Sequence, residues 1–365
     1  MNRHQVLGIF ERIAIHGVLV AAALVMLTPL VWMISTSLKA SGHSLSRGIE
    51  WLPWEDIYVS DALKTPVIVL GARVRNEEAG NTIEVGIASL RDRRRRTEVS
   101  LPEGRFSGEV LEYRVRNVSE ADQTAEAFWI PCDQLERRIG PRWSNYSEAL
   151  VKMRFFSLLA NTVAITFLGT LGTVLSCSLV AYGFARFRFP GRETLFMVLL
   201  SSMMLPPVVT MIPVYLIFRD LHWIDTLLPL FAPAWLGTNA FNVFLFRQFY
   251  MTLPFDLDDA ARIDGCSSFR IYWSILLPLS KPVMATVGIF SFTGLWLDFM
   301  GPLIYLNSIE KFTLSLGLYI FKGPYTVQWD YLMAATLVVS LPCIVIFFLG
   351  QRFFIQGTVL SGLKA

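Results

Sequence analysis

The chain has 365 residues, of which 53% are hydrophobic and only 17% are charged. A soluble domain carries about 25% charged residues, so the composition excludes an ordinary soluble protein and indicates a membrane protein with a soluble portion. The formal net charge of +3 is mild. It fits the surplus of Lys and Arg that membrane proteins keep on their cytoplasmic side and gives no reason to expect a nucleic-acid partner.

Long apolar segments predict transmembrane helices, because lipid offers no hydrogen-bond partners and each segment must satisfy its own backbone. The first, 13–38, is longer than the roughly 7–15 apolar residues of a signal peptide, so we expect a retained helix. The other segments are 156–184, 195–218, 227–246, 283–306 and 332–354. We therefore predict an all-α polytopic membrane protein with six transmembrane helices.

Residues 39–142, between the first two segments, have a different pattern. Stretches at 65–74, 82–90 and 109–118 are rich in β-branched residues, partly alternate, and are punctuated by turn-forming residues. This predicts a small extracytoplasmic β domain inserted between residues 1–38 and a core domain at 143–365. The basic run 91–96 raises the alternative of a nucleic-acid contact, but the nearby Asp and Glu residues favour a solvated hairpin tip.

The basic residues predict the orientation of the chain. Those in the loops after the second and fourth segments and near the two ends of the chain fall on one side of the membrane: Arg3, Arg12, Arg186, Arg188, Arg192, Arg262, Arg270, Lys281, Arg352 and Lys364. The short opposite loops, 219–225 and 307–331, hold few basic residues. The positive-inside rule then makes both termini cytoplasmic and residues 39–150 extracytoplasmic.

Enzyme and metal signatures are missing from the sequence. The four Cys and four His residues are scattered, without a disulfide framework or metal-ligand spacing. No G-x-x-x-x-G-K-[ST] phosphate loop occurs, nor a paired nucleophile and base. We therefore expect no catalytic residue, no metal and no cofactor bound by this chain.

The polar loop 254–282 between the fourth and fifth segments carries the most specific pattern. Acidic residues open it where a helix dipole favours negative charge, two alanines follow, and a glycine suits the turn after the helix. From residue types alone, this short cytoplasmic helix is either a lever that passes motion from a soluble engine to a pore or an amphipathic helix resting on lipid. The residues of the pattern are Asp259, Ala260, Ala261, Arg262, Asp264, Gly265, Ile275 and Pro278.

This pattern resembles the cytoplasmic EAA loop of the membrane subunits of ABC importers, with Asp259 where that family usually has Glu. Other stretches resemble the carbohydrate, maltose-type branch of the family, and the tail resembles that of its smaller permease subunit. The resemblance covers the first helix and nearly everything from residue 143, but not 39–141, because such subunits usually have a much shorter first external loop. The stretches are 143–150, 159–162, 181–191, 312–318, 329–335 and 352–365.

The resemblance implies a permease subunit of an ATP-driven, binding-protein-dependent importer for a sugar or oligosaccharide, in the inner membrane of a bacterium. Its implied partners are a second homologous permease, an ATPase dimer that holds ATP and Mg, an extracytoplasmic substrate-binding protein, and membrane lipid. The eight loop residues would couple ATPase motion to alternating access, with Arg262 as a salt-bridge donor. The outer loop 307–331 would meet the binding protein through a turn at Lys322, Gly323, Pro324 and Tyr325.

Candidates for the substrate pathway are polar or aromatic residues within the apolar segments. Sugars stack on aromatic faces and accept polar contacts, and an acid inside a membrane segment is a functional candidate by default. For each residue, ordinary helix packing is the alternative role. The candidates are Asn239, Asn242, Trp296 and Asp298.

Three other functions stay open. The first is an ABC permease for another solute, such as glycerol phosphate or an amino acid. The second is a membrane-anchored sensor or interaction protein built around the β domain, against which the long loop pattern argues. The third is a secondary transporter, which would need several buried acids and inverted repeats, whereas Asp298 is essentially the only such acid and no clear repeat is apparent.

Overall fold

The computed structural model describes residues 3–39, 56–60, 66–76, 81–86, 96–101, 104–117, 127–132, 135–139, 141–323 and 327–362. The chain divides into two compact units, Met1–Asn145 and Tyr146–Ala365. Each unit has its own core and is described by itself.

The first unit begins with helix α1 (Arg3–Ser37), which contains Pro29. Its stretch Ile15–Ser37 is long and apolar enough to cross a membrane, since about 20 residues at 1.5 Å each span the hydrocarbon core. Most side chains from Ile15 to Ile34 are exposed. The continuous first helix expected from 13–38 is therefore present, and its exposed apolar surface suits lipid or another membrane helix.

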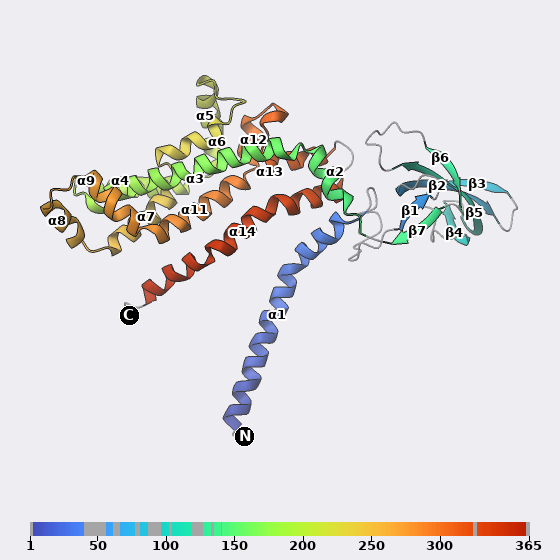
Figure 1. Cartoon of the computed structure of the whole chain (residues 1–365), viewed down its shortest axis with the longest axis horizontal. Helices are drawn as coiled ribbons and strands as arrows, with labels where there is room; N and C mark the ends of the chain where they lie inside the picture. Colours follow the sequence, from blue (N-terminus) through green and yellow to red (C-terminus); the bar gives the residue numbers. More distant parts are fainter. Residues whose placement is uncertain are drawn as a thin grey trace. The chain divides into compact units, whose positions relative to one another are not determined.

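The described part of the first unit also contains a β-sheet (Figure 1). Its strands are ordered β4-β5-β2-β1-β7, with β3 paired to β2 and β6 to β5, and every pairing is antiparallel. The predicted small β-sheet is present, and it continues beyond residue 118. The strands are β1 (Asp56–Ser60), β2 (Pro66–Asn76), β3 (Thr82–Gly86), β4 (Arg96–Leu101), β5 (Gly104–Asn117), β6 (Phe128–Pro131) and β7 (Leu135–Ile139).

Buried apolar side chains of the sheet form a small core. Bulges in the β2–β5 pairing, at Val69/Gly71 and Arg73/Val74, let the long strand β2 bend while it pairs with three neighbours. Of the basic run 91–96, only Arg96 lies among the described residues, where it opens β4. The buried core residues are Val69, Ala72, Val74, Val85, Val99, Val110, Tyr113, Val115 and Ile130.

The second unit is helical, and helix α2 (Ser144–Lys152) spans the boundary before it. Three of its helices are central: α3 (Phe155–Arg186), α7 (Ala240–Thr252) and α11 (Lys281–Trp296). The unit has further elements, the longest of which is its last helix. These are α4 (Arg192–Ser201), η3 (Ser202–Met204), α5 (Pro207–Asp220), α6 (Leu228–Phe231), η4 (Ala232–Leu236), α8 (Asp256–Ile263), α9 (Ser268–Ile271), η5 (Tyr272–Leu276), α10 (Leu277–Leu279), α12 (Met300–Tyr305), η6 (Ile309–Lys311), α13 (Leu314–Gly317), η7 (Leu318–Phe321) and α14 (Trp329–Gly362).

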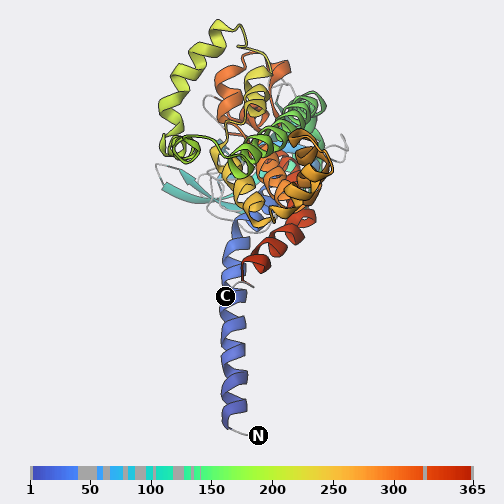
Figure 2. The same cartoon turned by 90° about the vertical axis from the view of Figure 1, so that its left-hand side faces the viewer.

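Helix α3 is the central element of this unit. Helices α7 and α11 and the 3-10 turn η4 pack against it, and α14 packs against α11 (Figure 1). Glycines let η4 and α11 approach closely, because a Cβ atom at Gly172 would lie 2.6 Å from the ring of Trp235, and one at Gly169 would lie 2.6 Å from Leu295. Helix α5 stands clear of the bundle (Figure 2), and most of its side chains are exposed.

The predicted membrane segments are bent or broken more often than expected. Segment 195–218 forms α4 and α5, which meet at 101° around Pro206-Pro207, and segment 283–306 ends at Trp296 after a bend of 78° near Ser280. Proline lacks the N–H group and clashes with the preceding turn, which explains the first break. The described residues contain three helices that can cross a membrane, or up to five if each bent pair counts as one span.

The fourth predicted segment, 227–246, is not one helix. It consists of α6, η4 and the start of α7, interrupted at Gly237, which has a φ of +67°. That backbone conformation is rarely open to other residues. A Cβ at this position would also lie 2.9 Å from Val180 of α3, so the break and the close packing on α3 occur together.

Candidate functional site

The short helix expected in loop 254–282 is α8, and both of its ends follow from the sequence. Asp256, Asp258 and Asp259 lie in its first turn, where the unpaired N–H groups attract negative charge. At the other end, Gly265 has a φ of +78° and donates its N–H to the Arg262 carbonyl at 3.0 Å. The N–H of Cys266 reaches the Ala261 carbonyl at 2.9 Å, which completes a Schellman cap.

The segment after α8 turns the chain into α11. Ser267 caps α9 by accepting the N–H of Arg270 at 3.4 Å. The next turn, η5, is a π-helix, a form that is frequent at functional sites. The chain then bends at Ser280, which is fully buried and donates its hydroxyl to the Leu276 carbonyl at 2.6 Å.

Most of the eight residues predicted for the loop pattern are exposed in the structure. Ala261 is an exception, because it is only 6% exposed and packs into the core of its own chain. Of the two alanines, only Ala260 is exposed for contact with another protein. Ile275 is half-buried against the same core. The exposed residues of the pattern are Asp259, Ala260, Arg262, Asp264, Gly265 and Pro278.

A buried ion pair joins α8 to the end of α3. The side chains of Arg186 and Asp258 are 1% and 6% exposed, and Arg186 Nε lies 3.3 Å from Asp258 Oδ2. Arg186 Nη2 donates to the Leu253 carbonyl at 3.1 Å, and the guanidinium lies 4.4 Å from the centroid of the Phe255 ring. Burial raises the pKa of Asp258, while the positive charges of Arg186 and Arg262 oppose that shift.

Two more residues of α3 contact the same loop. Tyr182 donates its hydroxyl to the Ser268 carbonyl at 3.0 Å, which holds the start of α9. The hydroxyls of Ser178 and Tyr272 lie 2.7 Å apart, which holds the π-helix. None of the contacts between α3 and this loop follows from the sequence pattern, which indicates only cytoplasmic basic charge at Arg186 and negative charge at the start of the short helix.

A second buried arginine fixes the start of α4 to α7. Arg247 Nη2 lies 3.3 Å from both carboxylate oxygens of Glu193, and its guanidinium lies 4.1 Å from the centroid of the Phe196 ring. The Arg247 side chain is 9% exposed, whereas that of Glu193 is mostly exposed. This pair ties the turn after α3 to α7.

At the other end of the bundle, Asp225 joins two loops. Its carboxylate accepts the backbone N–H groups of Asn307 and Ser308, each at 2.9 Å, and the hydroxyl of Ser308 at 2.6 Å. Lys311 Nζ donates to it at 2.9 Å. The hydrogen bonds from Ser308, Asn307 and Lys311 hold the pKa of Asp225 well below its usual range.

The predicted binding-protein turn is only partly described. Lys322 is exposed, and its ammonium group lies 5.8 Å from the centroid of the Tyr319 ring. Gly323 is half-buried. Pro324 and Tyr325 lie outside the described residues, so the projecting turn stays a prediction.

Each predicted pathway residue has a partner within the fold. Asn239 caps α7 by accepting the N–H of Asn242 at 3.0 Å, and the buried Asn242 amide donates to Ser291 at 3.4 Å. Asp298 accepts the N–H of Gly301 at 3.1 Å, at the start of α12. Their role in a pathway stays a prediction.

Trp296 is buried, like Asn242, and is only 4% exposed. Its indole N–H donates to the Val339 carbonyl at 2.9 Å, and its ring stacks on Phe292 with the centroids 5.3 Å apart. In this conformation the ring offers no face to a sugar, and the described contacts give it a packing role between α11 and α14.

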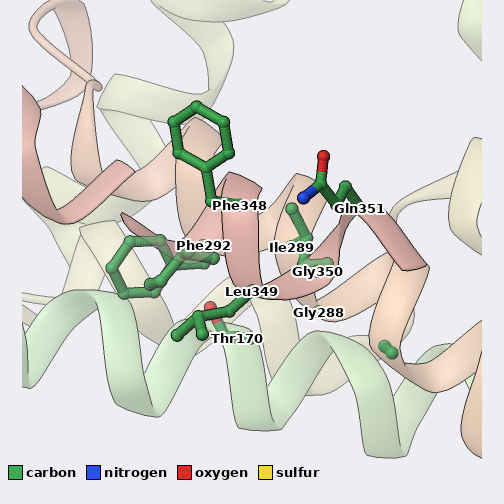
Figure 3. A pocket seen from close by; sticks show the side chains of 10 residues that line it. Thr170, Gly288, Ile289, Phe292, Phe348, Leu349, Gly350 and Gln351 are labelled. Carbon is green, nitrogen blue, oxygen red and sulfur yellow. The ribbon is translucent and has the colours of Figure 1, made fainter. Parts of the chain in front are cut away.

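A pocket of about 690 Å³ lies among α3, α11 and α14, and none of its lining residues was singled out by the sequence (Figure 3). Thr170 contributes a hydroxyl that has no hydrogen-bond partner within the described part of the chain. The lining is otherwise mostly apolar, which suits an apolar group better than a sugar. The lining residues are Thr170, Ala285, Gly288, Ile289, Phe292, Ile346, Phe348, Leu349, Gly350 and Gln351.

No group of three or more His, Cys, Asp or Glu side chains within the described ranges could hold a metal ion. The candidate site consists of an exposed helix and the contacts that fix it on the bundle.

Comparison with known proteins gives a consistent result. Residues 175–359 match the family described as binding-protein-dependent transport system inner membrane component. An arabinooligosaccharide transport system permease of Bacillus subtilis (strain 168) is 36% identical over 210 residues, which cover 58% of this chain and 74% of the relative.

Two further relatives are named for the transport of other solutes. A probable permease for starch degradation products of Thermoanaerobacterium thermosulfurigenes is 30% identical, over 60% of this chain and 80% of the relative. An sn-glycerol-3-phosphate transport system permease of Shigella flexneri serotype 5b (strain 8401) is 35% identical, over 56% of this chain and 73% of the relative.

One solved structure shares the fold across the whole chain. It is a bacterial ABC transporter involved in the import of the acidic polysaccharide alginate, with a TM-score of 0.62 and 18% identity, and the match covers 97% of this chain and 99% of the other. At this identity the likeness concerns the fold alone.

Proposed function

The chain belongs to the family of binding-protein-dependent transport system inner membrane components, and we propose that it imports a sugar or an oligosaccharide. Its relatives are named permease proteins of transport systems, so it is a transport subunit rather than an ATPase. The relatives for arabinooligosaccharides and starch degradation products support a carbohydrate substrate. The glycerol phosphate permease keeps another solute as the second candidate.

The transporter would assemble around this chain from several subunits. A second homologous permease would complete the pore, an ATPase dimer would bind ATP and Mg, and an extracytoplasmic protein would deliver the substrate. Both termini and α8 would face the cytoplasm, and the sheet would lie outside. The cluster of arginines around Arg186, Arg188 and Arg192 supports this orientation.

One observation carries the coupling role of loop 254–282. Helix α8 exposes Asp259, Ala260 and Arg262, and exposes the apolar Ile263 by 86%, while its opposite face is fixed in the core through Asp258 and Ala261. A helix that is rigidly held on one side and presents a mixed polar and apolar edge on the other suits docking in a groove of a soluble protein. ATP-driven closure of that protein would then move the helix, and the bundle would switch between its two open states.

The test is co-purification of the detergent-solubilised transporter with wild-type chain and with Gly265→Pro. Proline fixes φ near −65°, where Gly265 has +78°, and it removes the N–H that closes the helix cap. We expect the wild type to bring down an ATPase and a second permease, and Gly265→Pro to lose the ATPase. Gly265→Asn is the control, because asparagine tolerates the left-handed conformation and should retain binding.

Uptake of labelled arabinooligosaccharides, maltooligosaccharides and glycerol 3-phosphate then separates the substrate candidates.

A wild-type chain that brings down no ATPase, together with capture of some other protein by residues 39–142, would favour the anchored interaction protein instead.

A further inference from the structure

The α8 helix is held by a helix that is distant in sequence, not only by its two neighbours along the chain. Ser178, Tyr182 and Arg186 are spaced four residues apart on α3, so they lie on one face of that helix. They contact, in order, the π-helix at Tyr272, the start of α9 at Ser268, and α8. One stripe of α3 therefore holds the whole segment from α8 to η5.

Arg186 makes three kinds of contact with this segment. Its guanidinium pairs with Asp258, donates to the carbonyl of Leu253 just before α8, and stacks on Phe255. A planar, permanently charged group can make these contacts together, whereas an ammonium group cannot. The contacts fix both the position and the rotation of the first turn of α8.

The pair is poorly suited to stabilise the fold. Arg186 Nε and Nη1 and Asp258 Oδ1 are buried and make no hydrogen bond within the described part of the chain. A buried pair with incomplete hydrogen bonding repays little of the cost of removing two charges from water. A role beyond stability accounts better for two charges placed at this junction.

We propose that Arg186 and Asp258 are positioning residues that transmit the motion of α8 to α3, so that the coupling helix drives the centre of the bundle directly. This rests on the proposed function. Because α7, α11 and η4 all pack on α3, a displacement of its end reaches each of them without passing through the bends near Ser280 or Gly237. Without the contacts to α3, the motion of α8 would reach the other helices only along the chain, through those bends.

The first experiment uses the assembled transporter in proteoliposomes, with its binding protein and sugar. We compare wild type with Arg186→Gln, Asp258→Asn, the double variant and Arg186→Lys. We expect each neutral single variant to lower sugar transported per ATP hydrolysed by about tenfold, within the roughly 5- to 150-fold range of coupling between sites. The double variant should be no worse than either single variant, and Arg186→Lys should be intermediate.

The matched control is Arg188→Gln, which removes an exposed charge two residues after Arg186. It should leave sugar transported per ATP unchanged. A double variant whose losses multiply, or an Arg188→Gln variant as impaired as Arg186→Gln, would show that the pair does not act as a unit.

A second readout needs no transport. Ala261→Cys places a thiol on the buried face of α8, in a Cys266→Ser background, and mass spectrometry follows its modification by N-ethylmaleimide in the assembled complex. With Arg186→Gln, we expect modification to accelerate about tenfold relative to Arg188→Gln, because α8 separates from α3 more often. Equal rates would overturn the inference.

The outcomes distinguish this inference from the proposed function. If the wild type itself associates with no ATPase and transports no sugar, the proposed function fails. If the wild type transports and Arg186→Gln keeps both its coupling and its slow thiol modification, only the positioning role fails. Size-exclusion profiles and melting temperatures identify any variant that does not assemble.

Discussion

Single residues at the loops of the bundle fix its geometry, and Asp225 is the clearest example outside loop 254–282. It has a φ of +58° and binds the backbone of residues 307–308 together with Lys311. Replacement by alanine removes the charge and disfavours the backbone conformation, whereas asparagine keeps the conformation. We expect Asp225→Ala to lower the melting temperature in detergent more than Asp225→Asn does.

The pKa of Asp225 gives a second, pH-dependent prediction. Because the folded value lies below the ordinary 3.8, the unfolded state binds more protons in that window, so stability falls as the pH drops. The contribution is fully present above about pH 4 and is lost as the pH falls through the folded value. Melting curves of wild type and Asp225→Asn should converge as the pH is lowered, and a constant difference between pH 7 and pH 3 would contradict this assignment.

The Arg186–Asp258 pair predicts an asymmetric response to mutation. Asp258→Ala leaves a buried arginine that cannot lose its charge, which costs roughly 3 kcal/mol or more. Replacing both residues by apolar ones, as in Arg186→Met with Asp258→Leu, should restore much of that stability while transport stays impaired. Denaturant unfolding of the detergent-solubilised chain, compared with transport, measures both effects, and parallel losses of stability and transport would argue for a structural role alone.

At the level of elements, glycines on α3 decide how closely its neighbours approach. A Cβ atom at Gly172 would lie within 2.6 Å of the Trp235 ring, but one at Gly183 would meet nothing within 4 Å. Gly183→Ala should therefore stabilise the helix by up to about 1 kcal/mol through reduced chain entropy. Gly172→Ala should instead destabilise the protein by about 1–3 kcal/mol, because η4 must move. Thermal unfolding in detergent tests the contrast, and equal shifts would show that Trp235 moves aside freely.

Local sequence patterns predict some features of these elements but not others. The cap of α8 could be predicted, because it depends on residues within one turn of each other. The prolines at 206–207 explain why the chain bends there, but residue types alone do not specify the angle of 101°. The breaks near Gly237 and Ser280 were not predicted, since apolar composition is the same for straight and broken helices.

At the level of the whole molecule, the predicted orientation can be tested directly. Asn81, at the start of β3, and Ile263, at the end of α8, are both exposed. In a background with the four native cysteines replaced by alanine, a membrane-impermeant maleimide should label Asn81→Cys in spheroplasts. It should label Ile263→Cys only after permeabilisation. Labelling of both from the outside would contradict the positive-inside assignment of α8.

The sequence by itself determined the class of protein, the β insertion, the exposed helix in loop 254–282 and the family resemblance. These rest on composition, periodicity and turn chemistry, which act over a few residues. Only the tertiary structure decided which charges are paired, as Asp225 is with Lys311, and which pairs are buried, as Arg186 with Asp258 is. It also gave Trp296 a packing role and located the pocket beside Thr170. Those features join residues far apart in the chain, and local patterns carry no information about which distant side chains the packing of helices brings together.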